Sequence, residues 1–396
     1  MKKFCNFVLL CAVLLFASCC GSEQQPKVKN VIYLIGDGMG FGAVSSLLLS
    51  QEDSTAFEAA AAIGLAETCS ANNYVTDSPA GGTALATGVR TLNGYIGLDP
   101  DGQPLTSVLK KAQQMGKRSG IVVNTVLTEA TPAAFYAHVK GRSMGYQIAS
   151  QFVESDVDVA IGSGLSVFIN RPDSIDLTAS LIERGYDVYL DWNSVKNSEA
   201  DRFVGILPMS DVHRRNKPTE NKAGAADGAE VCLAAKMAAS DSEVTDSTQS
   251  ASCDPTQFLT LATEKALEAL GRDNKEGFFL MIESAIIDGY GHNNDSEGMI
   301  VEMKEFENTL QMLVEYVKRH PETLLVVTAD HETGGTSVAY RQFEVGTNPD
   351  VLLSFSTKGH SGTVVPIFAY GAGAKEFGAI MKNTDIPQKI EKLMQK

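Results

Sequence analysis

The sequence predicts an α/β fold: a three-layer α/β/α sandwich around a large, mainly parallel sheet, with an inserted lid-like region. Short apolar runs recur along the chain without polar alternation, which is typical of strands buried on both faces. Segments with helical periodicity separate these runs, as in parallel sheets covered by helices. The chain has 396 residues, of which 44% are hydrophobic and 20% are charged. This composition is that of a globular protein, and the length suits one large domain with insertions or two domains.

Six segments are predicted strands. In chain order they cover residues 31–35, 120–124, 156–161, 278–282, 324–328 and 364–369. The predicted helices cover residues 105–117, 255–270 and 296–319, and one more helix ends the chain. Another helix is expected to begin in the stretch VTDSPAGGTALATG. There Ser78 is the predicted N-cap and Pro79 takes the first helical position, where a missing N–H costs nothing.

Residues 210–253 differ from the rest of the chain. They are rich in Ala, Ser, Asp, Lys and Thr and show little apolar periodicity. We interpret them as an insertion or lid on the main domain, and a solvated surface loop without a function fits the same composition. Cys232 and Cys253 bracket a polar part of this stretch. In an exported protein they are predicted to form a disulfide, and two free thiols are the alternative.

The N-terminal segment has the pattern of an export signal. Lys2 and Lys3 precede an apolar run from Phe4 to Ala17, which is too short for a comfortable transmembrane helix. The run ends in the letters FASC, which resemble a bacterial lipoprotein cleavage site with Cys19 as the acylated residue. Cys20 is the competing choice, and secretion without a lipid is the alternative.

These features divide the chain into three parts. Residues 1–18 are the predicted signal peptide, residues 19–29 a lipid-anchored tether, and residues 30–396 the main domain. The predicted location is therefore the periplasm or the cell surface, with the membrane as a partner through the lipid on Cys19. The net charge of −15 argues against nucleic acid as a specific partner. The negative net charge also repels phosphate, so a phosphate ligand would need positively charged side chains close to its site.

Polar residues of the metal-binding type follow three of the predicted strands. Ligands of parallel α/β sheets bind beyond the carboxyl ends of the strands, so these side chains are expected to meet at one edge. In chain order they are Asp37 after strand 31–35, Glu283, Asp288 and His292 after strand 278–282, and Asp330 and His331 after strand 324–328. One such aspartate is usually a turn former or a helix cap, but three strands ending this way indicate a site.

The histidines refine this prediction. His292 follows Asp288 by four residues, a spacing that can bring both side chains to one ion across a single turn or a tight loop. His360 lies in the polar loop KGHSG. Mixed His and Asp ligands without Cys fit catalytic zinc, whereas sites made only of oxygen atoms suit magnesium.

Ser78 is surrounded by small residues at the start of its predicted helix. A helix N-terminus carries unpaired N–H groups and partial positive charge, which suits an anion. An ordinary capped helix in a Gly-rich region has the same pattern. A serine hydroxyl is a poor nucleophile unless a base or a metal activates it.

Six segments in order resemble the bacterial alkaline phosphatase family. They are VIYLIGDGMG, VTDSPAGGTALATG, TEATPAAFYAHVKGR, FFLMIESAIIDGYGH, VVTADHETGG and KGHSG. They run from about residue 31 to about residue 371, whereas residues 143–257 carry little that matches. The motif GDGMG alone would be weak, because related phosphotransferases share it.

The resemblance implies a metal-dependent hydrolase of small phosphate monoesters that releases phosphate and an alcohol through a phosphoserine on Ser78. It implies two zinc ions, one magnesium ion and a homodimer. The implied ligands are Asp288, His292 and His360 for one zinc; Asp37, Asp330, His331 and Ser78 for the other; and Asp37, Thr131 and Glu283 for the magnesium, with Glu129 beside it. Arg142 is similar to the family's phosphate-binding arginine, which can hold two phosphoryl oxygens at once.

Three positions depart from the family pattern. Glu129 stands where members more often have Asp or His, Gly289 where many have a larger residue, and Pro79 where a small residue is usual. These departures bear on the third metal and on the pH optimum and leave the residues of the two zinc sites intact.

Three other functions compete with this interpretation. A phosphodiesterase or phosphonate monoesterase on the same fold would have less use for Arg142, Thr131 and Glu283, which favour the doubly charged monoester. A sulfatase is disfavoured because Ser78-Pro79 does not continue as that family's signature. A lipoprotein that binds phosphate or metal without turnover would have lost a ligand or the nucleophile, and none is missing.

For the phosphatase, we expect two in-line displacements at phosphorus. Each displacement inverts the configuration, so the net result is retention.

Overall fold

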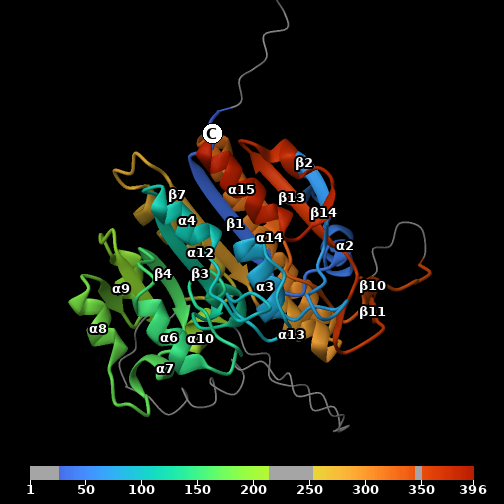
Figure 1. The fold of residues 1–396 in the computed structure, drawn as a ribbon. Helices are drawn as coiled ribbons and strands as arrows, with labels where there is room; N and C mark the ends of the chain where they lie inside the picture. The colour runs from blue at the N-terminus through green and yellow to red at the C-terminus, as the bar shows by residue number, and fades with distance from the viewer. Residues whose placement is uncertain (1–25, 214–252, 344–349) are drawn as a thin grey trace, which may run out of the picture.

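The computed structural model describes residues 26–213, 253–343 and 350–396 (Figure 1). The predicted signal peptide, the predicted lipidation site Cys19 and most of the predicted insertion 210–253 lie outside these ranges, as does Cys232 with its predicted disulfide. Within the described ranges, no helix has the length and apolarity needed to cross a bilayer.

A ten-stranded sheet forms the middle layer, in the order β14-β2-β13-β8-β1-β7-β3-β4-β6-β5. β13 pairs antiparallel with both of its neighbours, and every other pairing in this sheet is parallel. The prediction of a large, mainly parallel sheet is thus confirmed. The strands are β1 (Asn30–Gly36), β2 (Ala62–Glu67), β3 (Arg118–Val126), β4 (Val159–Ser163), β5 (Asp187–Tyr189), β6 (Phe203–Leu207), β7 (Phe278–Ser284), β8 (Thr323–Thr328), β13 (Val365–Gly371) and β14 (Ile380–Lys382).

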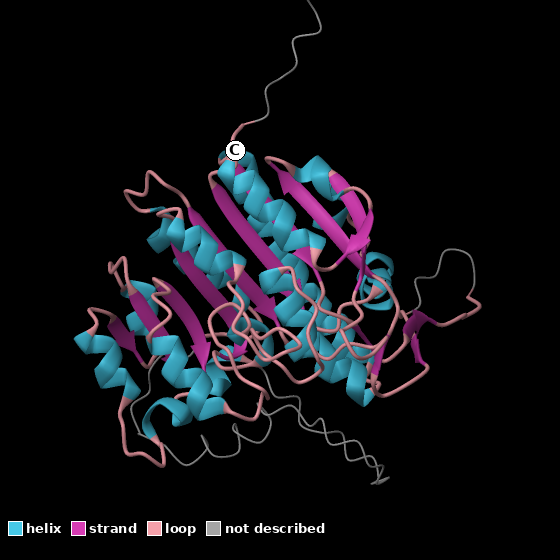
Figure 2. Ribbon diagram, in the orientation of Figure 1, coloured by secondary structure: helices cyan, strands magenta, loops and turns pink. Residues whose placement is uncertain are grey.

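Helices cover both faces of the sheet (Figure 2). On one face α3, α4 and α15 contact one another, and on the other α2, α12 and α14 form a connected layer. The described helices are α2 (Phe41–Ser50), α3 (Ser78–Thr87), α4 (Val108–Gln114), α5 (Ala130–Ala133), α6 (Gly145–Val153), α7 (Ser166–Ile169), α8 (Leu177–Glu183), α9 (Trp192–Asn197), α10 (Met209–Val212), α12 (Phe258–Gly271), α13 (Ile286–Asn293), α14 (Ser296–Arg319) and α15 (Asp385–Gln395), with the 3-10 helices η1 (Ala56–Ala59) and η3 (Ala374–Phe377).

All six predicted strands are present in the ten-stranded sheet, to which the structure adds β2, β5, β6 and β14. The added β5 and β14 are only three residues long, which leaves no apolar run to detect. β4 begins later than predicted because Asp156 has a positive φ of 57° and belongs to the preceding turn. The predicted long helix 296–319 is confirmed at both ends, whereas α4 is shorter than predicted because Ser107 caps it.

The start of α3 corrects one prediction. Asp77, not Ser78, is the N-cap, and its carboxylate accepts a hydrogen bond from the N–H of Ala80. Ser78 is therefore the first helical residue and Pro79 the second. The reason is chemical: the aspartate is the stronger acceptor for the helix N–H groups. Its capping leaves the hydroxyl of Ser78 directed toward other partners.

The four central strands set the position of the site. β8, β1, β7 and β3 are adjacent and mutually parallel, and β1, β7 and β8 are buried along their whole length. Their carboxyl ends therefore open on the same edge of the sheet, where ligands bind in parallel α/β folds. This is the lower edge in Figure 1, near the labels of α3 and α13.

Candidate active site

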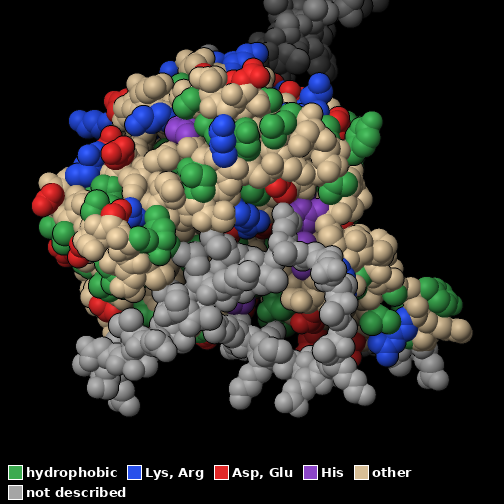
Figure 3. All heavy atoms as spheres, turned by 60° about the horizontal axis from the view of Figure 1, so that its bottom comes forward, with side chains coloured by type: hydrophobic (Ala, Val, Ile, Leu, Met, Phe, Trp, Pro, Cys, Tyr) green, Lys and Arg blue, Asp and Glu red, His purple; other side chains and the backbone are tan. Residues whose placement is uncertain are grey.

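The four central strands deliver most of the predicted site residues to one edge. Because these strands are neighbours, residues far apart in the sequence become neighbours there. Asp37 directly follows β1, Glu283 lies at the end of β7, Asp330 and His331 follow β8, and Glu129 and Thr131 follow β3. Figure 3, which turns this edge toward the viewer, shows histidine side chains gathered with acidic side chains nearby.

Small residues let α3 approach this edge closely. A Cβ atom on Gly81 would lie 3.0 Å from the carbonyl oxygen of Asp330, and one on Gly82 would lie 3.0 Å from the Cα of Thr131. Larger residues would push the helix away from both segments. The small residues after Ser78 thus bring its hydroxyl to 3.2 Å from Nε2 of His331.

Asp37, Asp330 and His331 form what we call the buried cluster. His331 Nε2 lies 3.4 Å from Asp37 Oδ1 and 3.2 Å from Asp330 Oδ2. The side chains of Asp330 and His331 are fully buried, and that of Asp37 is 5% exposed. Asp330 Oδ1 accepts hydrogen bonds from the N–H groups of Gly38 and His331, which turns Oδ2 toward the cluster.

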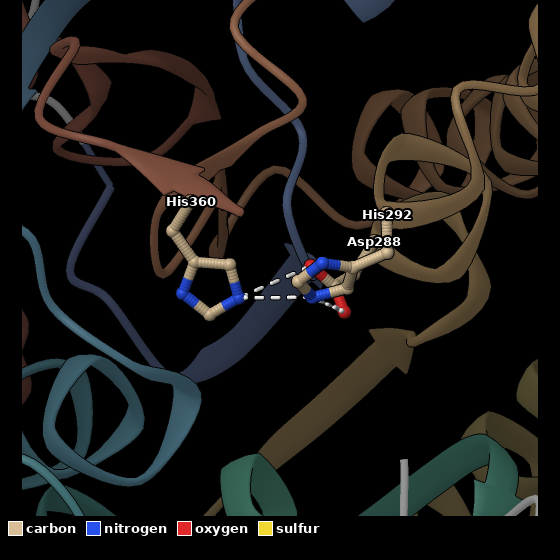
Figure 4. Close-up of side chains that lie close together, drawn as sticks. All are labelled: Asp288, His292 and His360. Atoms are coloured by element: carbon tan, nitrogen blue, oxygen red, sulfur yellow. Dashed lines mark hydrogen bonds and ion pairs between the residues drawn. The ribbon is translucent and has the colours of Figure 1, made fainter. Parts of the chain in front are cut away.

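Asp288, His292 and His360 form what we call the outer cluster (Figure 4). Asp288 and His292 lie one turn apart on α13, as predicted, and their side chains point toward His360. Asp288 Oδ2 is 3.3 Å from His292 Nε2, and Asp288 Oδ1 is 3.5 Å from His360 Nε2. The three side chains are between 6% and 24% exposed.

A short pairing outside the main sheet positions His360. β12 (His360–Ser361) pairs antiparallel with β9 (Glu332–Thr333), which places His360 opposite Thr333. The ring of His360 stacks on the ring of His331 with centroids 3.6 Å apart, so the two clusters adjoin. A second small pair, β10 (Thr336–Val338) with β11 (Leu353–Phe355), extends the same region.

The outer histidines are oriented for a cation. Nδ1 of His292 lies 2.5 Å from the carbonyl oxygen of Lys358, and Nδ1 of His360 lies 3.0 Å from that of Thr76. A carbonyl oxygen only accepts, so each Nδ1 carries the proton and each neutral ring keeps a lone pair on Nε2. These two Nε2 atoms face each other at 3.2 Å. Two facing lone pairs repel unless a cation lies between them, and backbone-bound imidazoles of this kind are usual metal ligands.

Asp37 and Asp330 fit a cation in the same way. Within the described ranges, Asp37 Oδ1 and Asp330 Oδ2 are buried without a hydrogen-bond partner. The same holds for both carboxylate oxygens of Glu283 and for the hydroxyl of Thr131. Buried carboxylate oxygens of this kind are costly unless a proton or a metal ion satisfies them. The donor chemistry therefore fits metal ions at all three predicted groups.

Glu129 and Arg142 lie together beside Glu283. Glu129 Oε1 accepts a short hydrogen bond from Nη2 of Arg142, and the Glu129 side chain is almost fully buried. Burial, followed by the charges of Glu129 and Asp330, raises the pKa of Glu283 well above its usual value. The guanidinium of Arg142 opposes this increase.

The pKa values of the two clusters shift in opposite directions. Burial and the nearby carboxylate of Asp288 raise the pKa of Asp330 to about 7. Burial, then Asp330, also raises the pKa of Asp37. For Asp288, burial alone would raise the pKa, but the hydrogen bond with His292 and the surrounding imidazoles lower it well below its usual value. Burial lowers the pKa of His331, so this ring is neutral and able to bind a metal.

Sequence analysis missed a polar support behind this edge. Glu302 on α14 accepts hydrogen bonds from Asn124 Nδ2 and Ser284 Oγ, and Asn124 Oδ1 accepts from the N–H of Ala285. This network ties the ends of β3 and β7 to α14. A glutamate on the buried face of α14 was the signal that could have revealed it. At Gly289, no atom lies within 4 Å of the position that a Cβ would take, so this departure from the family pattern leaves open space.

The fold and the site define a class of protein: an α/β enzyme in which two candidate metal-binding clusters adjoin and one of them contacts a serine hydroxyl. Comparison with known families makes this assignment specific. The family model described as alkaline phosphatase matches residues 28–349. The chain belongs to the alkaline phosphatase family, whose members depend on metal ions.

Several relatives are similar along almost the whole chain. Alkaline phosphatase 4 of Bacillus subtilis is 28% identical, with 94% of this chain and 90% of the relative covered. The streptomycin-6-phosphate phosphatase of Streptomyces griseus is also 28% identical, with coverages of 90% and 88%. Among solved structures, the alkaline phosphatase of the Antarctic bacterium TAB5 has a TM-score of 0.76 at 31% identity, with coverages of 94% and 99%. These relatives are phosphatases, and the chain is an enzyme of the same class.

Proposed function

We propose that this enzyme hydrolyses small phosphate monoesters through a phosphoserine on Ser78, with two zinc ions and one magnesium ion bound. One observation carries the proposal. The Ser78 hydroxyl lies 3.2 Å from His331 in the buried cluster, and the outer cluster adjoins through the stacked ring of His360. A nucleophile held against one of two adjoining clusters suits displacement at phosphorus.

The outer cluster would hold one zinc ion, and the buried cluster with Ser78 would hold the other. Asp37, Thr131 and Glu283, with Glu129 beside them, would hold the magnesium ion. When bound, these ions lower the pKa of hydroxyl groups and neutralise charge that develops on phosphoryl and leaving-group oxygens. Zinc is favoured by the mixed His and Asp ligands, and magnesium by the oxygen-only third group. Structures of TAB5 variants with Mg in a site named M3 support the last assignment.

The side chains of this chain would carry out two displacements. Ser78 Oγ, deprotonated, attacks phosphorus while the alcohol oxygen leaves from the opposite side with its bonding electron pair and is protonated from solvent. Arg142 donates two N–H groups to phosphoryl oxygens and holds the group in line. Water then attacks phosphorus, the bond to Ser78 Oγ breaks, and phosphate is released. Two inversions give net retention at phosphorus.

Hydrolysis of p-nitrophenyl phosphate at alkaline pH tests this function. The assay uses untreated enzyme, enzyme treated with a chelator, and treated enzyme given back zinc and magnesium. We expect activity to disappear with the chelator and to return with zinc. No activity in any state, with zinc confirmed by elemental analysis, would contradict the proposal, and bis-p-nitrophenyl phosphate would then test the diesterase alternative.

We also propose a lipid anchor on Cys19 and a homodimer. β1 begins at Asn30 on the amino edge of the sheet, whereas Asp37 lies at the carboxyl edge, so the chain before β1 joins the domain opposite the site (Figure 1). Labelling with a palmitate analogue that disappears in Cys19→Ala would support the anchor, and sedimentation would test the homodimer.

A further inference from the structure

Thr333 lies where the two clusters meet. It is fully buried in β9, two residues after His331, and its backbone N–H donates to the carbonyl oxygen of Gly38. Its hydroxyl donates to Asp288 Oδ1 at 2.5 Å, and the same Oγ1 lies 3.2 Å from Nδ1 of His331. One hydroxyl therefore contacts a carboxylate of the outer cluster and an imidazole of the buried cluster.

Two glycines leave just enough room for this side chain. A Cβ on Gly38 would lie 2.8 Å from Thr333 Oγ1, and a Cβ on Gly291 would lie 2.8 Å from Thr333 Cγ2. The hydroxyl thus faces the loop after β1, and the methyl group faces α13. Both directions are closed by backbone, so the side chain is held with its hydroxyl toward the clusters.

The chemistry of the three groups fixes the direction of the hydrogen bonds. An ionised carboxylate only accepts, so Thr333 must donate its single proton to Asp288. Its oxygen can then only accept from His331, which places the ring proton on Nδ1. Nε2 of His331 keeps its lone pair, faces Asp37 and Asp330, and accepts from the Ser78 hydroxyl.

We propose that Thr333 is a positioning residue that links the two clusters. Its hydroxyl fixes the His331 tautomer that exposes Nε2 to the buried cluster, and it orients the Asp288 carboxylate in the outer cluster. The inference rests on the proposed zinc binding by both clusters. It assigns to this chain an outer-sphere partner shared by two ligands, and such partners tune metal affinity.

Zinc binding by the complete, metal-free chain tests this role without any activity assay. Equilibrium dialysis against buffered free zinc compares wild type with Thr333→Val, which keeps the branched shape and removes the hydroxyl. We expect zinc affinity to fall about tenfold or more in this variant, the usual range for loss of such a partner. Thr333→Ser keeps the hydroxyl and loses the methyl group, and we expect it to retain wild-type affinity.

The histidine tautomer is a second measurement that packing alone would not change. The chain has only 6 histidines, so nitrogen NMR of labelled rings can resolve them. We expect the His331 signals of the wild type to report a proton on Nδ1, and those of Thr333→Val to report a mixture of tautomers.

These measurements distinguish a wrong role for Thr333 from a wrong proposed function. Equal zinc affinity and an unchanged tautomer in Thr333→Val would overturn the inference and leave the proposed function standing. A wild-type chain that binds no zinc would overturn the proposed function and this inference with it. If Thr333→Val fails to fold, Thr333→Ala and Thr333→Ser replace it, because this pair also differs by one hydroxyl. Weak zinc binding by the alanine variant alone would support the inference, and equal binding by both would overturn it.

Discussion

The two clusters use the same types of ligand in different surroundings. The buried cluster comes from loops after the adjacent strands β1 and β8, is nearly inaccessible and contacts Ser78. The outer cluster comes from α13 and the short strand β12 and is partly exposed. The buried position suits a nucleophile that must be held in place, and the exposed position suits exchange of water and alcohol.

The pKa values of the carboxylates also differ between the buried and the outer cluster. Burial, together with the crowded carboxylates, raises the pKa values of Asp37 and Asp330, whereas the hydrogen bond with His292 and the surrounding imidazoles lower the pKa of Asp288. The buried cluster is therefore electrostatically incomplete without a cation or bound protons. The difference teaches that burial and neighbouring charges together can shift the pKa values of identical ligands in opposite directions.

Ser78→Ala probes the buried side of the comparison and has the largest expected effect. The substitution removes the nucleophile and leaves the charged ligands of both clusters in place. We expect turnover of p-nitrophenyl phosphate to fall by about three orders of magnitude or more, while zinc content by elemental analysis stays unchanged. Activity within tenfold of wild type would show that Ser78 is not the nucleophile.

His360→Ala breaks the outer cluster and leaves the buried ligands intact. We expect the loss of one zinc equivalent and a fall in turnover of about a hundredfold or more, because leaving-group stabilisation is lost. His320→Ala is the matched control, since His320 is a partly exposed histidine that follows α14 outside both clusters. Unchanged zinc content in His360→Ala, or an equal loss in the control, would contradict the assignment of the outer cluster.

Arg142→Ala tests the phosphate contact beside the buried cluster. Burial raises the pKa values of Asp37 and Glu283, and the Arg142 guanidinium opposes this increase, so its charge acts on both carboxylates. We expect the inhibition constant for phosphate to rise about tenfold or more, since two charge-assisted hydrogen bonds are lost, with a smaller decrease in turnover. Arg142→Lys should give an intermediate value, and unchanged inhibition by phosphate would contradict the role.

The pH dependence of the free energy of unfolding, measured on the metal-free chain, is the smallest expected effect and compares the two clusters directly. Asp330 has a folded pKa of about 7 against an ordinary value of 3.8. At pH values between 3.8 and about 7, the folded state therefore keeps a proton on Asp330 that the unfolded state has released. The stability that this bound proton contributes is lost as the pH rises through 7. The slope from one proton is at most about 1.4 kcal/mol per pH unit.

Urea unfolding in chelator at about pH 5.5 and about pH 8 measures this slope. We expect Asp330→Asn to flatten the dependence. Asp288→Asn should move the dependence toward lower pH and keep part of it, because the Asp288 carboxylate is one cause of the raised pKa of Asp330 and burial is the larger one. Equal slopes in wild type and Asp330→Asn would contradict the contrast between the clusters.

Most of the site could be predicted from the sequence because its residues follow strands directly. Apolar runs mark the buried strands locally, and the polar residue after each run marks its carboxyl end. This is why Asp37, Glu283, Asp330 and His331 were found without tertiary information. The spacing of Asp288 and His292 on one helical turn is likewise a local property.

Only the tertiary structure decided the rest, because it depends on contacts between distant segments. The order β8-β1-β7-β3 made the strand ends neighbours, and the pairing of β12 with β9 brought His360 to Thr333. Competition between two adjacent acceptors made Asp77 the cap of α3 and left Ser78 facing His331. The opposite pKa shifts of Asp330 and Asp288 depend on which charges surround each carboxylate in three dimensions. The sequence determined which ligands are present, and packing determined how they are grouped, buried and tuned.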